Sequence, residues 1–296
     1  MKNQRICPFT DFGFKLIFGR DSTKEFTIDF LNCIFAEQDF FSPIVDLEFL
    51  DKEAEKYDIE SRGAIFDMHC RTSDGKEFIV EMQNSPQEFF VDRSLYYAGR
   101  MMAIQGKRGK EWNFELTPVY FVALMNFRLP ELGESELVHV AFCNLSTGKP
   151  ISSKVRFGYI QLPEFKKAKP EECVTAFDQW IYVLKNMEIM ERMPFVSTKE
   201  MFRRLDSVVS YAALSESEKK RYDAELKAYR DITNQLSYAE KKGREEGREK
   251  GREEGAIAAK KSTALRLLQL GLPDNEIAWA SGLPLDEVKV LKAGRE

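Results

Sequence analysis

The chain is poor in the residues on which several common kinds of site depend. It has two histidines, His69 and His139, which disfavours a histidine-rich zinc centre. Its five cysteines, at positions 7, 33, 70, 143 and 173, are scattered and odd in number, and none forms a CxxC pair. This pattern predicts reduced thiols in a cytoplasmic protein, several of them buried.

Long apolar runs and an excess of positive charge are also absent. No apolar stretch approaches the roughly 20 residues that a membrane-spanning helix needs, and the N-terminal stretch has no apolar run of the signal-peptide kind. The formal net charge of −4 provides no overall basic field for nucleic acid, so DNA binding would depend on a local basic patch. We therefore expect a soluble, cytoplasmic protein without membrane contact.

The chain does have enough apolar material for a large core, since 43% of its 296 residues are hydrophobic and 12% are aromatic. Length and patterning predict one large domain with an appendage. We expect an α/β core at residues 1–165 and a helical subdomain packed on it at 166–239. A charged helical linker at 240–255 and a small helical module at 256–296 would follow.

The chain is organised around residues 63–83, which predict a β-hairpin. Residues 64–72 and 76–83 form the two expected strands. Ser73-Asp74-Gly75 forms the turn, because a three-residue hairpin loop often ends in a left-handed glycine. The hairpin therefore has a definite expected pairing.

In this pairing Asp67 faces Glu81 and Ile65 faces Gln83, and directly opposed residues share one face of a sheet. A two-residue Asp74-Gly75 loop would instead place Glu81 on the other face from Asp67. The interpretation of the acidic residues thus depends on one register.

Two opposed carboxylates destabilise a strand pair unless something neutralises them. A hard divalent cation with oxygen ligands is the natural partner. The alternative is that Asp67 or Glu81 points into solvent and has no function. We favour a metal site, because the two acids and the amide of Gln83 are concentrated at one place. The expected core face of the hairpin consists of Phe66, Met68, Phe78, Val80 and Met82.

Two helices are expected near the N-terminus, an apolar stripe at residues 14–18 marking the first. Residues 22–35 predict the second, with Ser22 and Glu25 as a capping box. Asp11 has two possible roles. It either caps the first helix, which is the commoner role of such a residue, or reaches the acid pair as a third carboxylate.

A helix at residues 88–105 should follow the hairpin. On it Arg93, Tyr96, Tyr97 and Arg100 share one face, at helical spacing. Tyrosine and arginine beside metal ligands suit contact with phosphate. The alternative, equally favoured, is that the tyrosines pack on the sheet and the arginines are solvated.

The remaining pattern predicts further strands and helices. The near-continuous apolar run at 117–127 is typical of a strand that is covered on both faces. A charged connection at 51–62 is expected to form a loop beside the site. The other expected strands are residues 44–50, 138–145 and 152–162, and the other expected helices are 172–192, 198–212 and 216–238.

Residues 240–255 form a low-complexity repeat of glutamate, lysine, arginine and glycine. Six basic and six acidic residues balance, which argues against a nucleic-acid-binding arm. Opposite charges four residues apart support a solvated helix, whereas one glycine per turn weakens it. We interpret the repeat as a helical linker, whose glycine stripe could form a dimer seam.

Residues 256–294 predict a compact group of helices with Ala278, Gly282 and Val288 spaced as in a helix-turn-helix. The helix that would read DNA opens with Asp286 and Glu287, which repel phosphates. We therefore favour a dimerisation or interaction module over sequence-specific DNA binding.

Asp67, then Glu81-Met82-Gln83 on the next strand, followed by a helix and a buried strand, resembles the PD-(D/E)XK nuclease superfamily. The opening sequence of residues 11–18, DFGFKLIF, and the run from Glu81 to Arg100 are similar to the Rpn family of recombination-promoting nucleases, which are often labelled transposases. The resemblance covers roughly residues 8–240, and the charged repeat before a small helical tail is similar to that family too. Nothing in the residues themselves indicates transposition.

The resemblance implies a restriction-endonuclease-like α/β fold, with a mixed β-sheet flanked by helices and an all-α C-terminal extension. It also implies a cytoplasmic DNA endonuclease that uses Mg²⁺ or Mn²⁺, active in recombination. Gln83 stands where the superfamily usually has lysine. Glutamine can orient a water but carries no charge, which puts the rate or the metal requirement in doubt, although the Rpn pattern also has glutamine there.

From these residues we expect metal-assisted hydrolysis of phosphodiester bonds. Asp67, Glu81 and the carbonyl of Met82 would hold the metal, Gln83 would position the attacking water, and Asp11 would assist. The residues expected to contact DNA phosphates are Lys15, Arg93, Tyr96 and Arg100.

Two other classes stay open. One is a DNA-binding or protein-interaction module whose nuclease site is inactive. The other is a DNA-modifying partner that works only in a complex, with the C-terminal tail as its docking element.

Overall fold

The computed structural model describes residues 4–36, 38, 41–50, 66–106 and 113–294. The chain divides into two compact units, Met1–Thr233, here the core unit, and Asn234–Glu296, here the C-terminal unit. The charged loop expected at 51–62 lies outside the described residues, as does Ile65. Among the described residues, no helix combines the length and the apolar character that a membrane span requires.

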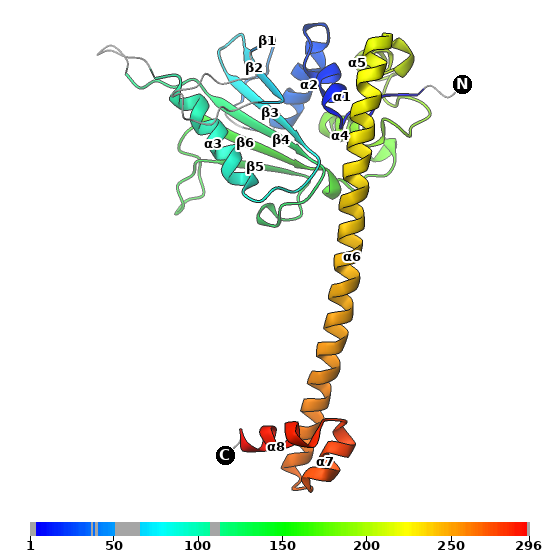
Figure 1. Cartoon of the computed structure of the whole chain (residues 1–296). Coiled ribbons are helices and arrows are strands. Elements are labelled where there is room, and N and C mark those ends of the chain that lie inside the picture. The colour runs from blue at the N-terminus through cyan, green and yellow to red at the C-terminus, as the bar shows by residue number, and fades with distance from the viewer. Residues whose placement is uncertain (1–3, 37, 39–40, 51–65, 107–112, 295–296) are drawn as a thin grey trace, which may run out of the picture. The chain divides into compact units, whose positions relative to one another are not determined.

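The core unit is built on a mixed sheet whose six described strands have the order β1-β2-β3-β4-β6-β5 (Figure 1). The β1-β2, β2-β3 and β5-β6 pairs are antiparallel, whereas β4 is parallel to both β3 and β6. All seven residues of β4 are buried, as its continuous apolar run predicted. The strands are β1 Leu47–Phe49, β2 Met68–Thr72, β3 Glu77–Gln83, β4 Val119–Met125, β5 Leu137–Ala141 and β6 Val155–Gln161.

Helices cover both faces of this sheet (Figure 1). Helix α3, Phe90–Ala103, packs on one face, and α1, α2, α4, α5 and the first part of α6 pack on the other. Trp180 is the centre of the larger core and contacts the rings of Phe18, Phe30 and Phe202. The other α-helices of the core unit are α1 Asp11–Phe18, α2 Lys24–Phe35, α4 Ala176–Asn186, α5 Glu200–Val208 and the start of α6 Glu216–Gln269. Short 3-10 helices are η1 Asp21–Thr23, η2 Pro130–Leu132, η3 Leu162–Glu164, η4 Pro170–Glu172 and η5 Tyr211–Ala213.

The hairpin of β2 and β3 has the three-residue loop that the sequence predicts. The Thr72 amide donates a hydrogen bond to the Lys76 carbonyl over 2.9 Å, and Gly75 adopts a left-handed conformation with φ of 88°. Met68 pairs with Val80 and His69 with Ile79. The register that places Asp67 opposite Glu81 is therefore confirmed.

Two local expectations about apolar and capping residues are wrong. The chain bends at Asp67, so β2 begins at Met68, and Phe66 packs with Ile79 and Tyr97 in the cluster under α3. Met68, Phe78 and Val80 lie in the opposite core, so both faces of the hairpin are buried. Ser22 caps no helix, because Asp21–Thr23 forms a 3-10 turn and α2 starts at Lys24 without a side-chain cap.

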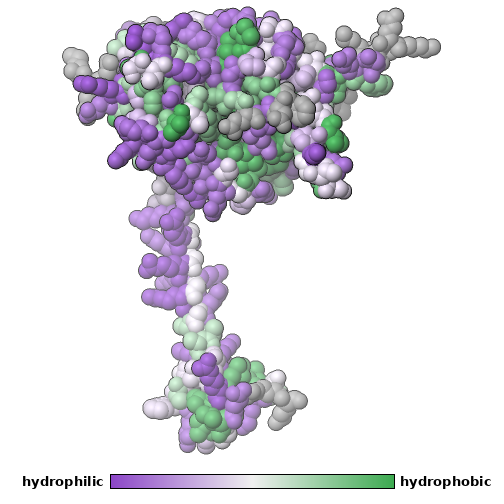
Figure 2. Space-filling model, turned by 180° about the vertical axis from the view of Figure 1, so that it is seen from behind, coloured by the Kyte–Doolittle hydropathy of each residue, from purple (hydrophilic) through white to green (hydrophobic). Residues whose placement is uncertain are grey.

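The C-terminal unit contains the last part of α6, then α7 Asp274–Ser281 and α8 Leu285–Ala293. Its small core consists of Ala264, Ile277, Leu283 and Val288. Left-handed glycines follow α6 and α7, with φ of 73° at Gly271 and 69° at Gly282. The repeat at 240–255 is helical, as expected, and Figure 2 shows hydrophilic side chains along this part of α6.

Candidate active site

An acid pair lies where β3 ends and β2 begins. Asp67 stands opposite Glu81, and each carboxylate accepts a hydrogen bond from the backbone of the other strand. The Met82 amide donates to Oδ2 of Asp67 over 2.8 Å, and the Asp67 amide donates to Oε1 of Glu81 over 3.3 Å. The hairpin backbone therefore holds both carboxylates at one end of the sheet.

Burial and mutual repulsion disfavour a fully charged pair. Glu81 is 3% exposed, and its burial, followed by the charge of Asp67, raises its pKa to about 7. Burial also raises the pKa of Asp67. Glu77, on the same strand face, is a useful contrast. It too is buried, yet hydrogen bonds from His69 and Arg71 lower its pKa. Unlike Glu77, the acid pair thus has no neighbours that fully offset its burial.

Two side chains extend the site from the acid pair towards α3. The Gln83 amide Nε2 donates to Oε2 of Glu81 over 3.3 Å, and Nη2 of Arg93 lies 3.4 Å from the same oxygen. Gln87 links them, since its Nε2 donates to Gln83 Oε1 over 3.2 Å and its Oε1 accepts from Arg93. Arg93 is therefore not a solvated side chain but a member of the site.

This arrangement agrees with the comparison with protein families. The family model described as PD-(D/E)XK nuclease family transposase matches residues 8–239, most of the chain. The chain belongs to this family. Neither the curated proteins nor the solved structures give a match.

The residues of this PD-(D/E)XK protein fit a hard divalent cation, as nucleases of this kind generally use. Two carboxylates and a backbone carbonyl are oxygen ligands of the type that such an ion prefers. A bound cation would also offset the repulsion between the two buried carboxylates. Among the described residues, Arg93 is the one charged partner that contacts the pair directly. In the described part of the chain, no three histidine, cysteine or acidic side chains lie together so that they could hold a metal among themselves. The protein's share would thus be Asp67, Glu81 and the carbonyl of Met82.

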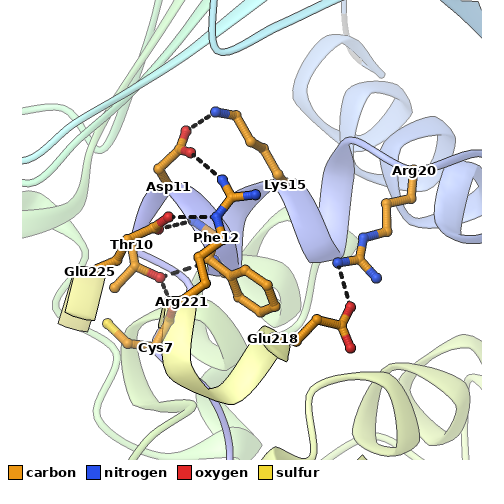
Figure 3. Close-up of polar contacts among 10 residues, drawn as sticks. Cys7, Thr10, Asp11, Phe12, Lys15, Arg20, Glu218, Arg221 and Glu225 are labelled. Atoms are coloured by element: carbon orange, nitrogen blue, oxygen red, sulfur yellow. Dashed lines mark hydrogen bonds and ion pairs between the residues drawn. The ribbon is translucent and has the colours of Figure 1, made fainter. Parts of the chain in front are cut away.

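Asp11 does not cap α1. Thr10 does so, since its Oγ1 accepts a hydrogen bond from the Gly13 amide over 2.9 Å. Asp11 lies in the first turn and pairs with Lys15 and with Arg221, the latter at 3.3 Å (Figure 3). Burial raises the pKa of Asp67 most, and the hydrogen bond from the Met82 amide opposes it. The negative charge of Asp11 raises the pKa of Asp67 further, and the positive charge of Lys15 lowers it. Both side chains are therefore within electrostatic range of the acid pair.

Helix α6 holds α1 in this position (Figure 3), a role that local sequence patterns do not indicate. Glu225 accepts a hydrogen bond from the Phe12 amide over 2.5 Å and pairs with Arg221 at 2.9 Å. About two turns before Glu225, Glu218 pairs with Arg20 at 3.1 Å. On the hairpin side, the side-chain Nδ2 of Asn84 donates to the Phe9 carbonyl over 2.8 Å. The site thus draws residues from both ends of the matched region.

The residues expected to contact phosphate do not share one environment. Tyr96 is 47% exposed, and Lys15 is partly exposed. Arg100 is buried and donates from Nη1 to the Tyr96 hydroxyl over 3.2 Å, so its burial argues against the expected phosphate contact. Tyr97 packs edge-on against Phe66 with ring centroids 5.2 Å apart. Of the two tyrosines, Tyr97 therefore packs in the core, as the alternative interpretation predicted, whereas Tyr96 remains exposed.

Proposed function

We propose that the chain is a metal-dependent DNA endonuclease that hydrolyses phosphodiester bonds. The acid pair carries the proposal, because two buried carboxylates of like charge that face each other suit a bound cation better than solvent. The family to which the chain belongs supports the reaction class. We further propose that the protein belongs to the Rpn branch and works on DNA during recombination in the cytoplasm.

Asp67, Glu81 and the carbonyl of Met82 would hold Mg²⁺, or Mn²⁺ in its place. Such an ion, when bound, lowers the pKa of a coordinated water and stabilises negative charge on the phosphate. Gln83 orients the attacking water through its side-chain amide. Asp11 supports the site as a third acid once it leaves Lys15 or Arg221. Lys15, Arg93 and Tyr96 are the proposed phosphate contacts.

The test is the nicking of supercoiled plasmid in Mg²⁺ or Mn²⁺. We expect cleavage by the parent, and its loss in EDTA and in the near-isosteric variants Asp67→Asn and Glu81→Gln. Glu48→Gln is the matched control, since Glu48 is an exposed acid on the neighbouring strand that pairs with Arg71. Equal nicking by all four proteins would mean a contaminating nuclease and would refute the assignment of the site.

One observation favours a second candidate, a DNA-binding or interaction module with an inactive site. Gln83 offers no positive charge for the developing phosphate charge, and Arg93, the cation that contacts the acid pair, is already bound to Glu81. Tight DNA binding without nicking by the parent, with Mg²⁺ affinity lost in Asp67→Asn, would support this candidate.

We also propose that the C-terminal unit forms a homodimer. An apolar groove in this unit is lined by Ile257, Leu283 and Val290, and Val290 is 71% exposed. Lys260 and Lys261 line the groove from α6, and Asp286 and Glu287 line it from α8, so a two-fold pairing can match opposite charges. The stripe of Gly243, Gly247, Gly251 and Gly255 offers close approach, because an added Cβ there meets nothing within 4 Å.

Light scattering after size exclusion tests this assembly. The parent should have the mass of a dimer, whereas Val290→Glu and residues 1–233 alone should have the mass of a monomer. A monomeric parent, or a dimer that survives the removal of residues 234–296, would contradict the proposal. Nicking by residues 1–233 would also show that docking through the tail is not obligatory.

A further inference from the structure

An exposed phenylalanine stands at the entrance to α3, next to the proposed active site. Phe89 is 68% exposed, whereas its neighbour Phe90 is 2% exposed and packs against Phe127 and Tyr159. No ring or cation of the described residues contacts Phe89. The fold therefore gains little packing from this side chain.

The backbone of Phe89 is also unusual. Its φ of 61° and ψ of 29° place it in the left-handed region, where an L side chain other than glycine or asparagine is strained. It sits at the N-cap of α3 without providing a capping side chain. Glycine or asparagine would serve the helix better at this position. Neither the left-handed backbone nor the exposure of the ring is explained by a contact that stabilises the fold.

A comparison with Phe195 sharpens this point. Phe195 has a similar left-handed backbone, with φ of 63°. Its ring is partly buried and packs against Tyr182 and Phe202, with centroids 6.2 Å and 5.6 Å away. Core packing explains Phe195, whereas the ring of Phe89 is left free for something outside the chain.

Phe89 is connected to the acid pair by one helical turn. The Arg93 amide donates to the Phe89 carbonyl over 2.9 Å, and the Arg93 guanidinium reaches Glu81. Because α3 begins at Phe90, Phe89 lies just before the helix, and this hydrogen bond places its backbone one turn from Arg93. Gln87, two residues before Phe89, is hydrogen-bonded to Gln83. A phosphate held at Arg93 would therefore place its nucleotide within reach of the Phe89 ring.

We propose that Phe89 is a stacking platform for an unpaired base, and that it directs the enzyme to DNA with single-stranded character at the cleavage point. This inference rests on the proposed nuclease function. An aromatic ring stacks on any base with a free face. Inside a duplex each base is already covered on both sides, so only an unpaired, terminal or flipped base qualifies. The residues around Phe89, namely Pro86, Gln87 and Glu88, are exposed and mostly polar, which does not suit the contiguous apolar centre of a protein interface.

The first test is binding. Fluorescence anisotropy in EDTA, with every protein in the Glu81→Gln background to prevent cleavage, would compare a single-stranded oligonucleotide with a relaxed, covalently closed duplex minicircle, which has neither ends nor unpaired loops. We expect Phe89→Gly to weaken single-strand binding by about 10- to 100-fold and to leave duplex binding within about twofold. Phe89→Trp should retain single-strand binding. Phe89→Gly should fold at least as well as the parent, because it removes a left-handed Cβ.

Phe114 offers a matched control. It is 77% exposed and left-handed, with φ of 63°, but it precedes β4, whose first residue pairs with Glu77 rather than with Gln83. It therefore lies towards the other end of the sheet from the acid pair. We expect Phe114→Gly to bind both DNAs as the parent does.

Several results would overturn the inference. These are equal weakening on both DNAs, no weakening on either, a parent that does not bind the single strand, or a change of oligomeric mass in Phe89→Gly, which would assign the ring to a protein contact. Cleavage assays separate the two proposals. Nicking that depends on Asp67 but ignores Phe89 would refute the stacking platform alone. A Phe89-dependent binding preference without Asp67-dependent nicking would refute the nuclease and leave the platform standing.

Discussion

Replacement of Glu81 by glutamine should stabilise the metal-free protein at alkaline pH. Glu81 is 3% exposed and lies opposite another carboxylate, and its pKa is raised from 4.5 to about 7. The folded chain therefore holds a proton on Glu81 that the unfolded chain has already released. Because a tenfold difference in proton affinity corresponds to about 1.4 kcal/mol, a rise of this size costs the charged folded state about 3 kcal/mol.

The sign follows from proton binding in the two states. Between pH 4.5 and about 7 the folded state binds one more proton than the unfolded state, so the free energy of unfolding falls as the pH rises. The loss is complete above the folded pKa. Glu81→Gln carries no such proton and should lack this contribution to the decline, whereas Asp67, whose pKa is also raised by burial, keeps its own.

The assay is urea unfolding in EDTA at about pH 5 and about pH 8.5. We expect the free energy of unfolding of Glu81→Gln to exceed that of the parent by about 3 kcal/mol at the higher pH, and the difference to shrink strongly at the lower pH. Mg²⁺ should restore the parent and not the variant, because a ligand that binds the folded state adds stability. A difference that does not change with pH would refute the reasoning.

Arg93→Gln extends the same test. The Arg93 charge lowers the pKa of Glu81 against burial and Asp67, so its removal should move that pKa above about 7. The pH range in which the metal-free protein loses stability should therefore extend upward. A variant with the parent's pH dependence would show that Arg93 is screened from the acid pair.

The remaining predictions concern the framework of the core unit. Gly13→Ala should lower the free energy of unfolding by about 3 kcal/mol or more, because the new Cβ would lie 2.0 Å from the Cys7 carbonyl oxygen. Gly99→Ala, where nothing lies within 4 Å, should instead raise it by about 0.5–1 kcal/mol in the same urea titration. Tyr222→Phe should cost about 1–3 kcal/mol, because the buried Cys7 amide donates to the Tyr222 hydroxyl over 2.8 Å; an unchanged midpoint would contradict this. The fragment of residues 1–233 should unfold cooperatively, at the same urea concentration as the core unit within the full chain. A non-cooperative transition would show that the core needs the C-terminal unit.

The hairpin could be predicted because its determinants are local. A glycine at the end of a three-residue loop sets the turn, and the turn sets the register that brings Asp67 opposite Glu81. The burial of β4 and the helical repeat of α6 were predictable for the same reason, since each depends on the pattern of its own residues. The capping box at Ser22 failed on a local competitor, the 3-10 turn of Asp21–Thr23.

By itself, then, the sequence determined the acid pair and its amide neighbour, because neighbouring residues control the backbone there. Only the tertiary structure decided what surrounds the pair. Asp11 meets Arg221 and the Phe12 amide meets Glu225 across more than 200 positions of the chain. Arg93 reaches Glu81, whereas Arg100, two turns later on the same helix, is buried. Burial and ion pairing depend on which distant segments pack together, and the period of a single helix or strand does not contain that information.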